Sequence, residues 1–421
     1  MAIKAIPAVP VQRTMVIGLD YGTYATKIVA RPRDNKLGRI IQIEPTATNY
    51  VDGTVPSLVT CDNGRLYFGK QAHERPGGQK YRFLKIAMLT NRHFTDDLSV
   101  QLGLTPDILV TAYLAWILGN LKTHASLKNF ALRLNLAAPI NHVEDSDLRD
   151  RYLRIINAAW QLSIETNLPP IKQGEFVAQV RHRLSEHLKR PLPAQGLRPF
   201  AVLPETLAPV ASIIDEGWLN DGIHMAIDIG AGTTEMTVFR VGGKNGRVIT
   251  PYWSQYNPIG DNDLKSLGSV LDADSPSRNE VFKIFNKLIR EIWQRSYQFD
   301  MSSQAAKPTW KQLQIILSGG GTRRTTTDDA IRRVNPFFAF QGAHDRDSRD
   351  LVLHIKLSRV NGQLEKGDSI LPHETFLFAV ANGLAIEEKK WPTLNEVSKL
   401  KAIPASPNEY DKPVGYWYLG D

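Results

Sequence analysis

Apolar residues in this chain fall into short runs that end at glycine-containing turns, and the same layout occurs twice. The run TMVIGLD, from Thr14, ends at Asp20 and is followed across a glycine turn by a second run, TKIVARP. The run HMAIDI, which ends one residue after Asp228, is followed by a Gly/Thr turn and by MTVFRV. Two apolar runs that flank a tight turn predict a β-hairpin. We therefore predict two hairpins of one design about half a chain apart, which indicates an internal duplication.

The rest of the chain alternates between strand-like and helix-like patterns. The strand-like segments are NFALRLNLAAPI, FAVLPETLAP and QLQIILSGGGT, and the helix-like segments are LTPDILVTAYLAWILGNL, DSDLRDRYLRIINAAW, NEVFKIFNKLIREIWQRSYQF and ETFLFAVANGLAIEEKK. Alternating strands and helices predict the α/β class. The longest apolar run, Ile108 to Leu121, is shorter than the roughly 18–20 residues that a membrane span needs. We therefore expect it to be a buried core helix and expect no membrane span.

Composition narrows the class of protein further. The chain has 421 residues, with 51 Lys and Arg against 43 Asp and Glu, and 42% of its residues are hydrophobic. That balance excludes a disordered or fibrous chain, and the length predicts two to four lobes. A single cysteine, Cys61, excludes an intramolecular disulfide and a cysteine-rich zinc site. We expect a cytoplasmic protein, because the first residues also lack the apolar core of a secretory signal. The net charge of +8 permits a nucleic-acid partner but does not argue for one.

The two predicted hairpin turns carry residues suited to phosphate and Mg²⁺. Each places an aspartate, Asp20 or Asp228, at the end of a strand beside small residues. The glycines Gly22, Gly230 and Gly232 would let backbone N–H groups approach a phosphate, and the hydroxyls of Thr23, Thr233 and Thr234 would add donors. The two aspartates would hold a hydrated Mg²⁺, which prefers oxygen ligands. The alternative for each turn alone is a plain hairpin with an Asx turn.

Five segments in order resemble the actin-like ATPase superfamily, which includes actin, ParM, MreB and the DnaK-type chaperones. GLDYGTYATKIV resembles the first phosphate loop and AIDIGAGTTEMTVF the second, IILSGGGTRR resembles the adenosine motif, and LNLAAPI and FAVANGLAI resemble the segments that connect the lobes. The resemblance implies a two-lobe α/β fold around a nucleotide cleft that binds ATP or ADP with Mg²⁺. The lobes would comprise residues 15–206 plus 375–390, with an inserted subdomain at about 35–125, and residues 207–374. Residues 1–14 would be an N-terminal extension and 391–421 a tail.

The resemblance also implies roles for single residues. Asp20 and Asp228 would hold Mg²⁺ through water, and the glycines and threonines of the two turns would form the phosphate cradle. Gly319, Gly320, Gly321 and Thr322 would lie under the sugar and base, with Arg323 stacked on adenine. Glu205, in LPETLAP, would position the attacking water, the alternative being an exposed acid at a helix start. Lys27 matches a phosphate-contacting lysine of actin and ParM, and Lys85 aligns with a phosphate lysine of DnaK-type proteins. For both, an ordinary surface lysine is the alternative.

Three departures bear on which branch of the family the chain resembles. Ala231 stands where many relatives have a third glycine, and FAVANGLAI lacks the acidic pair that precedes it in the chaperones. The 33 residues after Glu388 are also too few for a DnaK-type peptide-binding domain.

We therefore expect an ATPase that assembles into nucleotide-dependent filaments, as ParM does, for plasmid segregation or a prokaryotic cytoskeleton. Its partners would be copies of itself and a DNA-binding adaptor. A non-polymerising DnaK-like switch is the main alternative, and a small-molecule kinase is a third. The basic segment 180–190 is typical of a solvated helix face, with an adaptor or filament contact as the alternative.

Overall fold

The computed structural model contains several sheets in a mixed α/β arrangement. It describes residues 13–35, 37–89, 94–138, 146–165, 170–217, 219–231, 233–243, 248–257, 283–292, 295–296, 314–320, 352–354, 360–361 and 377–395. Gly232 and Gly321 to Arg323, all predicted nucleotide contacts, therefore lie outside the described residues, as do positions 1–12 and 396–421. No helix in these ranges is both long and apolar enough to cross a membrane.

The first hairpin prediction is confirmed, and its strands lie at the centre of one sheet. The members of this sheet are β1 (Thr14–Tyr21), β2 (Ala25–Pro32), β3 (Gly38–Ile40), β4 (Thr54–Pro56), β8 (Ala131–Ala138), β10 (Phe200–Pro204) and β16 (Val360–Asn361). Their order is β10-β8-β1-β2-β3-β16, with β4 on β2. Strands β8 and β10 run parallel to β1, whereas β2 is antiparallel to β1 and β3 is antiparallel to β2.

The second hairpin lies at the centre of another sheet with the same strand pattern. Its members are β11 (Gly222–Ile229), β12 (Thr234–Gly242), β13 (Val248–Asn257), β14 (Gln314–Ser318), β15 (Val352–His354) and β17 (Thr393–Leu394). The order is β15-β14-β11-β12-β13-β17. Strands β14 and β15 are parallel to β11, and β12 and β13 continue the sheet antiparallel. Strands β1, β2, β3, β8 and β10 of the first sheet thus occupy places equivalent to those of β11, β12, β13, β14 and β15 in the second, which is the pattern that the predicted duplication implies.

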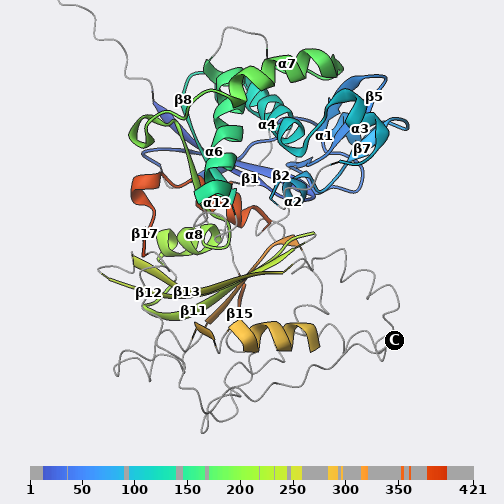
Figure 1. The fold of residues 1–421 in the computed structure, drawn as a ribbon. Helices are drawn as coiled ribbons and strands as arrows, with labels where there is room; N and C mark the ends of the chain where they lie inside the picture. The colour runs from blue at the N-terminus through green and yellow to red at the C-terminus, as the bar shows by residue number, and fades with distance from the viewer. Residues whose placement is uncertain are drawn as a thin grey trace, which may run out of the picture.

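Helices cover the sheet of β1, and a small third sheet lies beside it (Figure 1). The longer helices are α4 (Pro106–Thr123), α6 (Ser146–Trp160), continued by a π-helical turn (Gln161–Glu165), and α7 (Val177–Leu188). The shorter ones are α1 (Gly69–Glu74), α2 (Leu84–Leu89) and α3 (Asp97–Leu102), and the third sheet holds β7 (Gln79–Tyr81), β5 (Val59–Asp62), β6 (Arg65–Phe68) and β9 (Glu175–Phe176).

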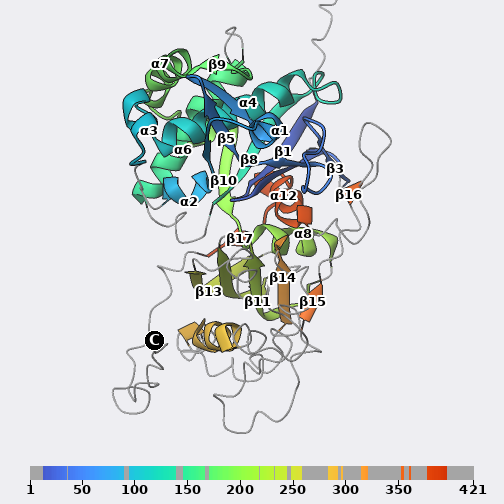
Figure 2. The same ribbon diagram turned by 90° about the vertical axis from the view of Figure 1, so that its right-hand side faces the viewer.

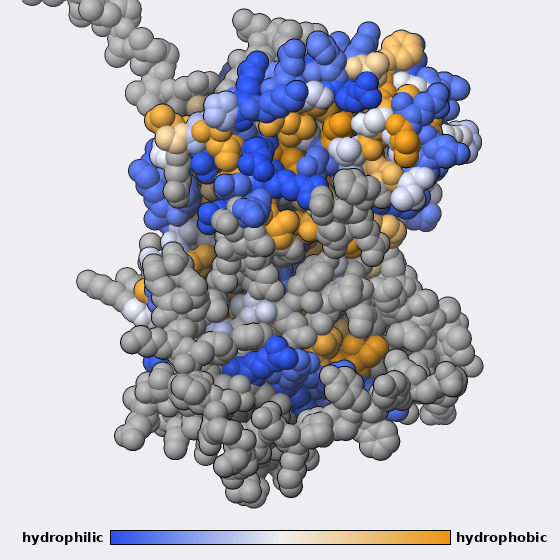
Figure 3. Space-filling view, viewed as in Figure 1, coloured by the Kyte–Doolittle hydropathy of each residue, from blue (hydrophilic) through white to orange (hydrophobic). Residues whose placement is uncertain are grey.

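Helix α4 confirms the prediction of a buried core helix. The Thr105 hydroxyl accepts a hydrogen bond from the Ile108 amide at 3.3 Å, and Pro106 occupies the first turn, where its missing N–H costs nothing. Its side chains are buried on nearly all sides against one large apolar core. On the face shown in Figure 3, the surface over this half of the molecule mixes hydrophilic and hydrophobic side chains.

Two short helices, α8 (Ala208–Glu216) and α12 (Ala379–Leu384), lie between the two large sheets in both views (Figures 1 and 2). They pack at a distance that only glycine allows. A Cβ on Gly383 of α12 would lie 1.7 Å from the Ala208 carbonyl oxygen, and a Cβ on Gly18 of β1 would lie 2.0 Å from the Ala381 carbonyl oxygen. Helix α12 is therefore in backbone contact with β1 on one side and with α8 on the other.

Polar side chains fix this contact. The Asn135 amide of β8 donates to the carbonyl oxygens of Leu384, the last residue of α12, at 2.7 Å, and of Ile386, just beyond the helix, at 2.9 Å. Arg31 of β2 forms an ion pair of 2.6 Å with Asp215 of α8. Both interactions are buried or nearly so, and they orient α8 and α12 against the sheet of β1.

Replacing Gly383 with alanine should destabilise the fold, because the new methyl group meets backbone atoms that cannot rotate away. We expect Gly383→Ala to lower the free energy of unfolding by at least about 1–3 kcal/mol in urea titrations. Gly242→Ala is the matched control, since a Cβ there has nothing within 4 Å. Equal stability of the two variants would contradict the close packing.

Candidate functional site

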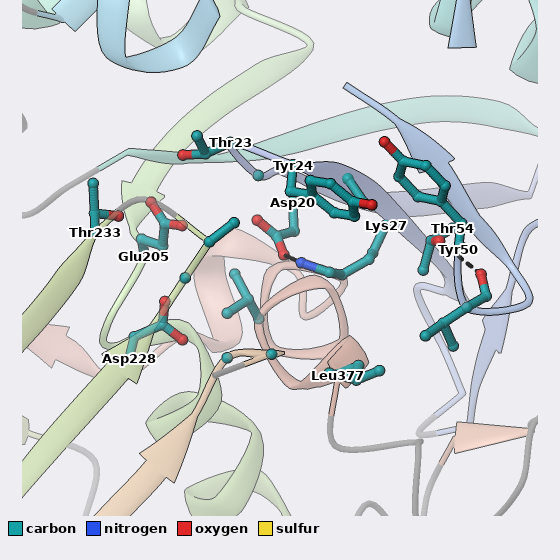
Figure 4. A pocket seen from close by; sticks show the side chains of 18 of the residues that line it. Asp20, Thr23, Tyr24, Lys27, Tyr50, Thr54, Glu205, Asp228, Thr233 and Leu377 are labelled. Atoms are coloured by element: carbon teal, nitrogen blue, oxygen red, sulfur yellow. Dashed lines mark hydrogen bonds and ion pairs between the residues drawn. The ribbon is translucent and has the colours of Figure 1, made fainter. Parts of the chain in front are cut away.

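The ends of β1 and β11 bring two buried aspartates to one cavity of about 250 Å³ (Figure 4). Asp20 is 2% exposed and Asp228 is 8% exposed. Each lies opposite a charged residue in its hairpin: Asp20 pairs in register with Lys27, and Asp228 with Glu235. The cavity is slightly smaller than the range of about 300–1,000 Å³ that is typical of small-molecule pockets.

Residues of both turns line the cavity. The predicted residues that line it are Asp20, Gly22, Thr23, Lys27, Glu205, Asp228, Gly230, Thr233, Gly319 and Gly320. Thr234 is instead 1% exposed within β12 and is absent from the lining. The Ala231 backbone position also lines the cavity, so the departure from a third glycine falls at its wall.

Gly22 and Gly319 lie where any side chain would clash with neighbouring backbone atoms. A Cβ on Gly22 would lie 2.6 Å from the Ala25 carbonyl oxygen and 3.4 Å from the Lys27 ammonium nitrogen. Gly319 has a φ of +88°, and a Cβ there would lie 2.3 Å from the Ile229 carbonyl oxygen. The glycine at the end of β14 therefore packs directly against the end of β11.

Lys27 provides a cation at the first turn. Its ammonium nitrogen lies 2.7 Å from Asp20 Oδ2, in an ion pair that is mostly buried. Burial alone would lower the pKa of Lys27, but the negative charges of Asp20, Asp228 and Glu205 outweigh it, so the net shift raises the pKa. Lys27 is therefore a permanent positive charge in the cavity, rather than an ordinary surface lysine.

Glu205 lies just after β10, and its carboxylate is paired with Lys85 of α2. The Lys85 ammonium donates to Glu205 Oε2, and the two side chains are 5% and 14% exposed, respectively. Burial lowers the pKa of Lys85, but Glu205, Asp20 and Glu235 reverse this effect and raise the pKa above its ordinary value. Glu205 is therefore not an exposed acid at a helix start, and Lys85 is not an ordinary surface lysine.

Asp228 is held by a residue that sequence reasoning missed. The Ser318 hydroxyl, at the end of β14, donates to Asp228 Oδ1 at 2.6 Å. Burial raises the pKa of Asp228 to about 6, and the nearby negative charge of Glu205 adds to the effect. Ser318 comes directly before the triple glycine. Its position at a strand end, beside the predicted adenosine motif, is the sequence feature that could have identified it as a site residue.

Glu235 is the other missed residue, and it is 5% exposed beside the same carboxylates. The sequence feature that could have identified it is its spacing: Glu235 follows Asp228 by seven positions, as Lys27 follows Asp20. Because the hairpins are duplicated, the two residues occupy equivalent register positions. One hairpin therefore presents a cation to the site where the other presents an anion.

The charges and donor atoms fit a hydrated Mg²⁺. Among the described residues the site holds four carboxylates, on Asp20, Glu205, Asp228 and Glu235, but two lysines. Asp20 Oδ1 is buried and has no hydrogen-bond partner among the described residues, so it is available to a cation or its water. In the same part of the chain, no three Asp, Glu, His or Cys side chains converge to bind one metal ion directly.

Comparisons with known proteins add little to this geometry. No protein-family model matches the chain, and no curated protein matches it. The chain is similar to a solved structure titled "pCBH ParM non-polymerisable quadruple mutant", with 13% identity and a TM-score of 0.40, over 89% of this chain and 98% of that one. A TM-score this low does not establish a shared fold, so the interpretation of the site rests on its own residues.

The buried ion pair yields a stability prediction. We expect Lys85→Met to lower the free energy of unfolding by about 3–5 kcal/mol, because it leaves Glu205 buried among other carboxylates without its cation. The double variant Lys85→Met/Glu205→Gln should lose less than the sum of the single variants, as measured by urea titration. For comparison, Arg295→Met breaks an exposed pair with Glu291 and should cost less than about 1 kcal/mol. Strict additivity of the two site variants would show that the pair is not coupled.

Proposed function

We propose that the chain is an ATP-hydrolysing enzyme of the actin-like type, with the nucleotide between two related α/β lobes. The observation that carries the proposal is the duplicated hairpin: two sheets of equal strand order each direct an aspartate and a small-residue turn to one cavity. A phosphate chain requires backbone donors from both sides and a cation between them, and this arrangement offers both.

In this proposal different cavity residues hold the phosphates in different ways. The turns at Gly22–Thr23 and Gly230–Thr233 donate to phosphate oxygens, and Lys27 adds a positive charge. Asp20 and Asp228 would hold Mg²⁺ through water, and the ion would neutralise charge on the phosphate oxygens. Gly319 and Gly320 leave room for the sugar at the end of β14. For Gly321, Thr322 and Arg323 the proposed contacts with the sugar and base are those that the resemblance implies.

Glu205 is proposed to orient the attacking water. Its carboxylate lies at the cavity between the two turns, and its ion pair with Lys85 restricts the directions it can take. The terminal phosphate would touch loops of both lobes, so its loss on hydrolysis would remove that link and favour a more open arrangement.

Assembly into filaments is the cellular role we propose, with a DNA-binding adaptor as partner. The support is the actin- and ParM-like position of Lys27, together with the LPETLAP segment that carries Glu205. A nucleotide-dependent closure would match two complementary surfaces of neighbouring copies, and such a heterologous contact extends without closing into a ring.

Nucleotide binding is tested by thermal stability. Mg·ATP at about 100 times its Kd should stabilise the protein by about 2.7 kcal/mol and raise the melting temperature. Asp20→Ala should abolish the Mg²⁺-dependent part of this increase, whereas Asp34→Ala, on an exposed turn, should keep it. An unchanged melting temperature with ATP and with ADP, and no binding heat, would refute the site.

Hydrolysis is tested at Glu205. Glu205→Ala should retain Mg·ATP binding and slow turnover by about 10²–10⁴-fold, since it removes the group that orients the water. Glu205→Gln serves as a second variant that keeps a hydrogen-bond acceptor for Lys85, and Glu388→Ala, at an exposed position, is the control. Wild-type turnover in both Glu205 variants would exclude the proposed role.

Assembly is tested by sedimentation and light scattering at micromolar protein. Polymers should form with ATP or a non-hydrolysable analogue, shorten after hydrolysis, and persist longer in Glu205→Ala. Negative-stain microscopy should show filaments under the same conditions. Only monomers over a range of salt and protein concentrations would contradict the filament role and leave a nucleotide-dependent switch as the better account.

A further inference from the structure

Two tyrosines, Tyr24 and Tyr50, form an aromatic wall at one end of the main cavity (Figure 4). Their rings are stacked, with centroids 4.6 Å apart and planes only 8° from parallel. Tyr24 is 39% exposed although Tyr50 covers one face of its ring, so part of the ring remains open to the cavity. An aromatic ring that is supported on one face and open on the other can accept a second flat group.

The backbone holds the two rings of the aromatic wall in place. Tyr24 follows the first turn directly, and its carbonyl oxygen accepts a hydrogen bond from the Ser57 amide, just after β4, at 3.0 Å. Tyr50 lies in the segment that leads into β4, next to Asn49, whose φ of +68° is a conformation that asparagine adopts more readily than most residues. The His73 ring meets Tyr50 edge-on, with centroids 5.1 Å apart. The aromatic wall is therefore formed before any ligand binds, which lowers the cost of binding one.

An apolar surface faces the aromatic wall, and this divides the cavity into two chemically different ends. Leu377, just before α12, and Val380, within it, both line the cavity, and Leu377 lies on the opposite side from the two tyrosines (Figure 4). A Cβ on Gly320 would lie 4.0 Å from Leu377 Cδ2, so the apolar surface continues to the glycines after β14. The carboxylates of Glu205 and Asp228 lie at the other end (Figure 4). One end thus suits phosphates with a cation, and the other suits a flat, mostly apolar group.

The charges around the aromatic wall suit a ligand that also carries phosphates. Burial, together with the neighbouring Tyr24, raises the pKa of Tyr50, so its ring stays neutral at physiological pH and does not repel an anion. The Lys27 side chain lies beside Tyr24 and adds a positive charge where the two ends meet (Figure 4). A ligand that joins phosphates to a flat group would therefore fit both ends at once.

We propose that the aromatic wall packs against the nucleoside part of the bound nucleotide, with Tyr24 as the contact residue. The inference rests on the ATPase function proposed above, and it adds a determinant of nucleotide affinity on the hairpin of β1. The glycines after β14 would hold the nucleoside from the sheet of β11, and Tyr24 would hold it from the sheet of β1. A nucleoside held from both sheets leaves only when they move apart, so the aromatic wall also slows the release of ADP.

The test uses titration calorimetry to compare a non-hydrolysable ATP analogue with tripolyphosphate, which carries the phosphates but no nucleoside, both with Mg²⁺. Tyr24→Ala should raise the Kd for the ATP analogue by about 5–100-fold, the usual effect of losing one stacked aromatic side chain, and leave the Kd for tripolyphosphate unchanged. Tyr24→Phe keeps the ring and should recover most of the lost affinity. Phe176→Ala is the matched control, since Phe176 is 43% exposed and is not among the residues that line the cavity.

The outcomes separate this inference from the ATPase proposal. If Tyr24→Ala binds both ligands as the wild type does, the aromatic wall has no role and the ATPase proposal stands. An equal loss for both ligands would also overturn the inference, because it would show that Tyr24 only shapes the turn. If the wild-type chain binds neither ligand, both proposals fall. Should Tyr24→Ala melt at a lower temperature without ligand, Tyr24→Leu replaces it: leucine keeps an apolar contact with Tyr50 and should still weaken binding of the ATP analogue more than that of tripolyphosphate.

Discussion

The contact of α12 with β1 and α8 is the constraint on which the rest of this structure depends. Backbone meets backbone at Gly18 and Gly383, where even a methyl group has no room. Because β1 carries Asp20 and the segment before α8 carries Glu205, this contact sets how the Asp20 and Glu205 carboxylates face each other. Asn135, which donates to two carbonyl oxygens at the end of α12, keeps the helix from sliding along the strand.

Charge compensation is the second organising feature, and it follows from the duplication. Equivalent positions of the two hairpins carry Lys27 and Glu235, so the pseudo-symmetric scaffold produces an asymmetric site. Lys27 neutralises Asp20, and Lys85 neutralises Glu205, whereas Asp228 relies on a hydroxyl. The site therefore retains an excess of negative charge that suits a divalent cation, and burial, together with the nearby charge of Glu205, raises the pKa of Asp228.

Sequence patterns predicted the fold class and the hairpins well because those features depend on local periodicity. An apolar run, an aspartate and a glycine turn are readable one after another, and so is the apolar length of α4. The interaction partners of the site residues were harder to predict from the sequence. Lys85 lies 120 positions from Glu205, and Ser318 lies 90 positions from Asp228, so only the packed structure brings them together. Glu235 could have been found, since the spacing of seven was visible in both hairpins.

The chain passes between the two large sheets more than once, and this has a mechanical consequence. After β10 the chain leaves the sheet of β1, passes through α8 and enters the sheet of β11. After α12 it enters the sheet of β11 again, where β17 pairs with β13. Between these crossings, β16 follows β15 along the chain but pairs with β3. Several chain connections between two sheets permit rotation of one sheet relative to the other about the line through the connections, and they resist twisting and separation of the sheets. A single backbone cut at one crossing would leave the two sheets attached through the others.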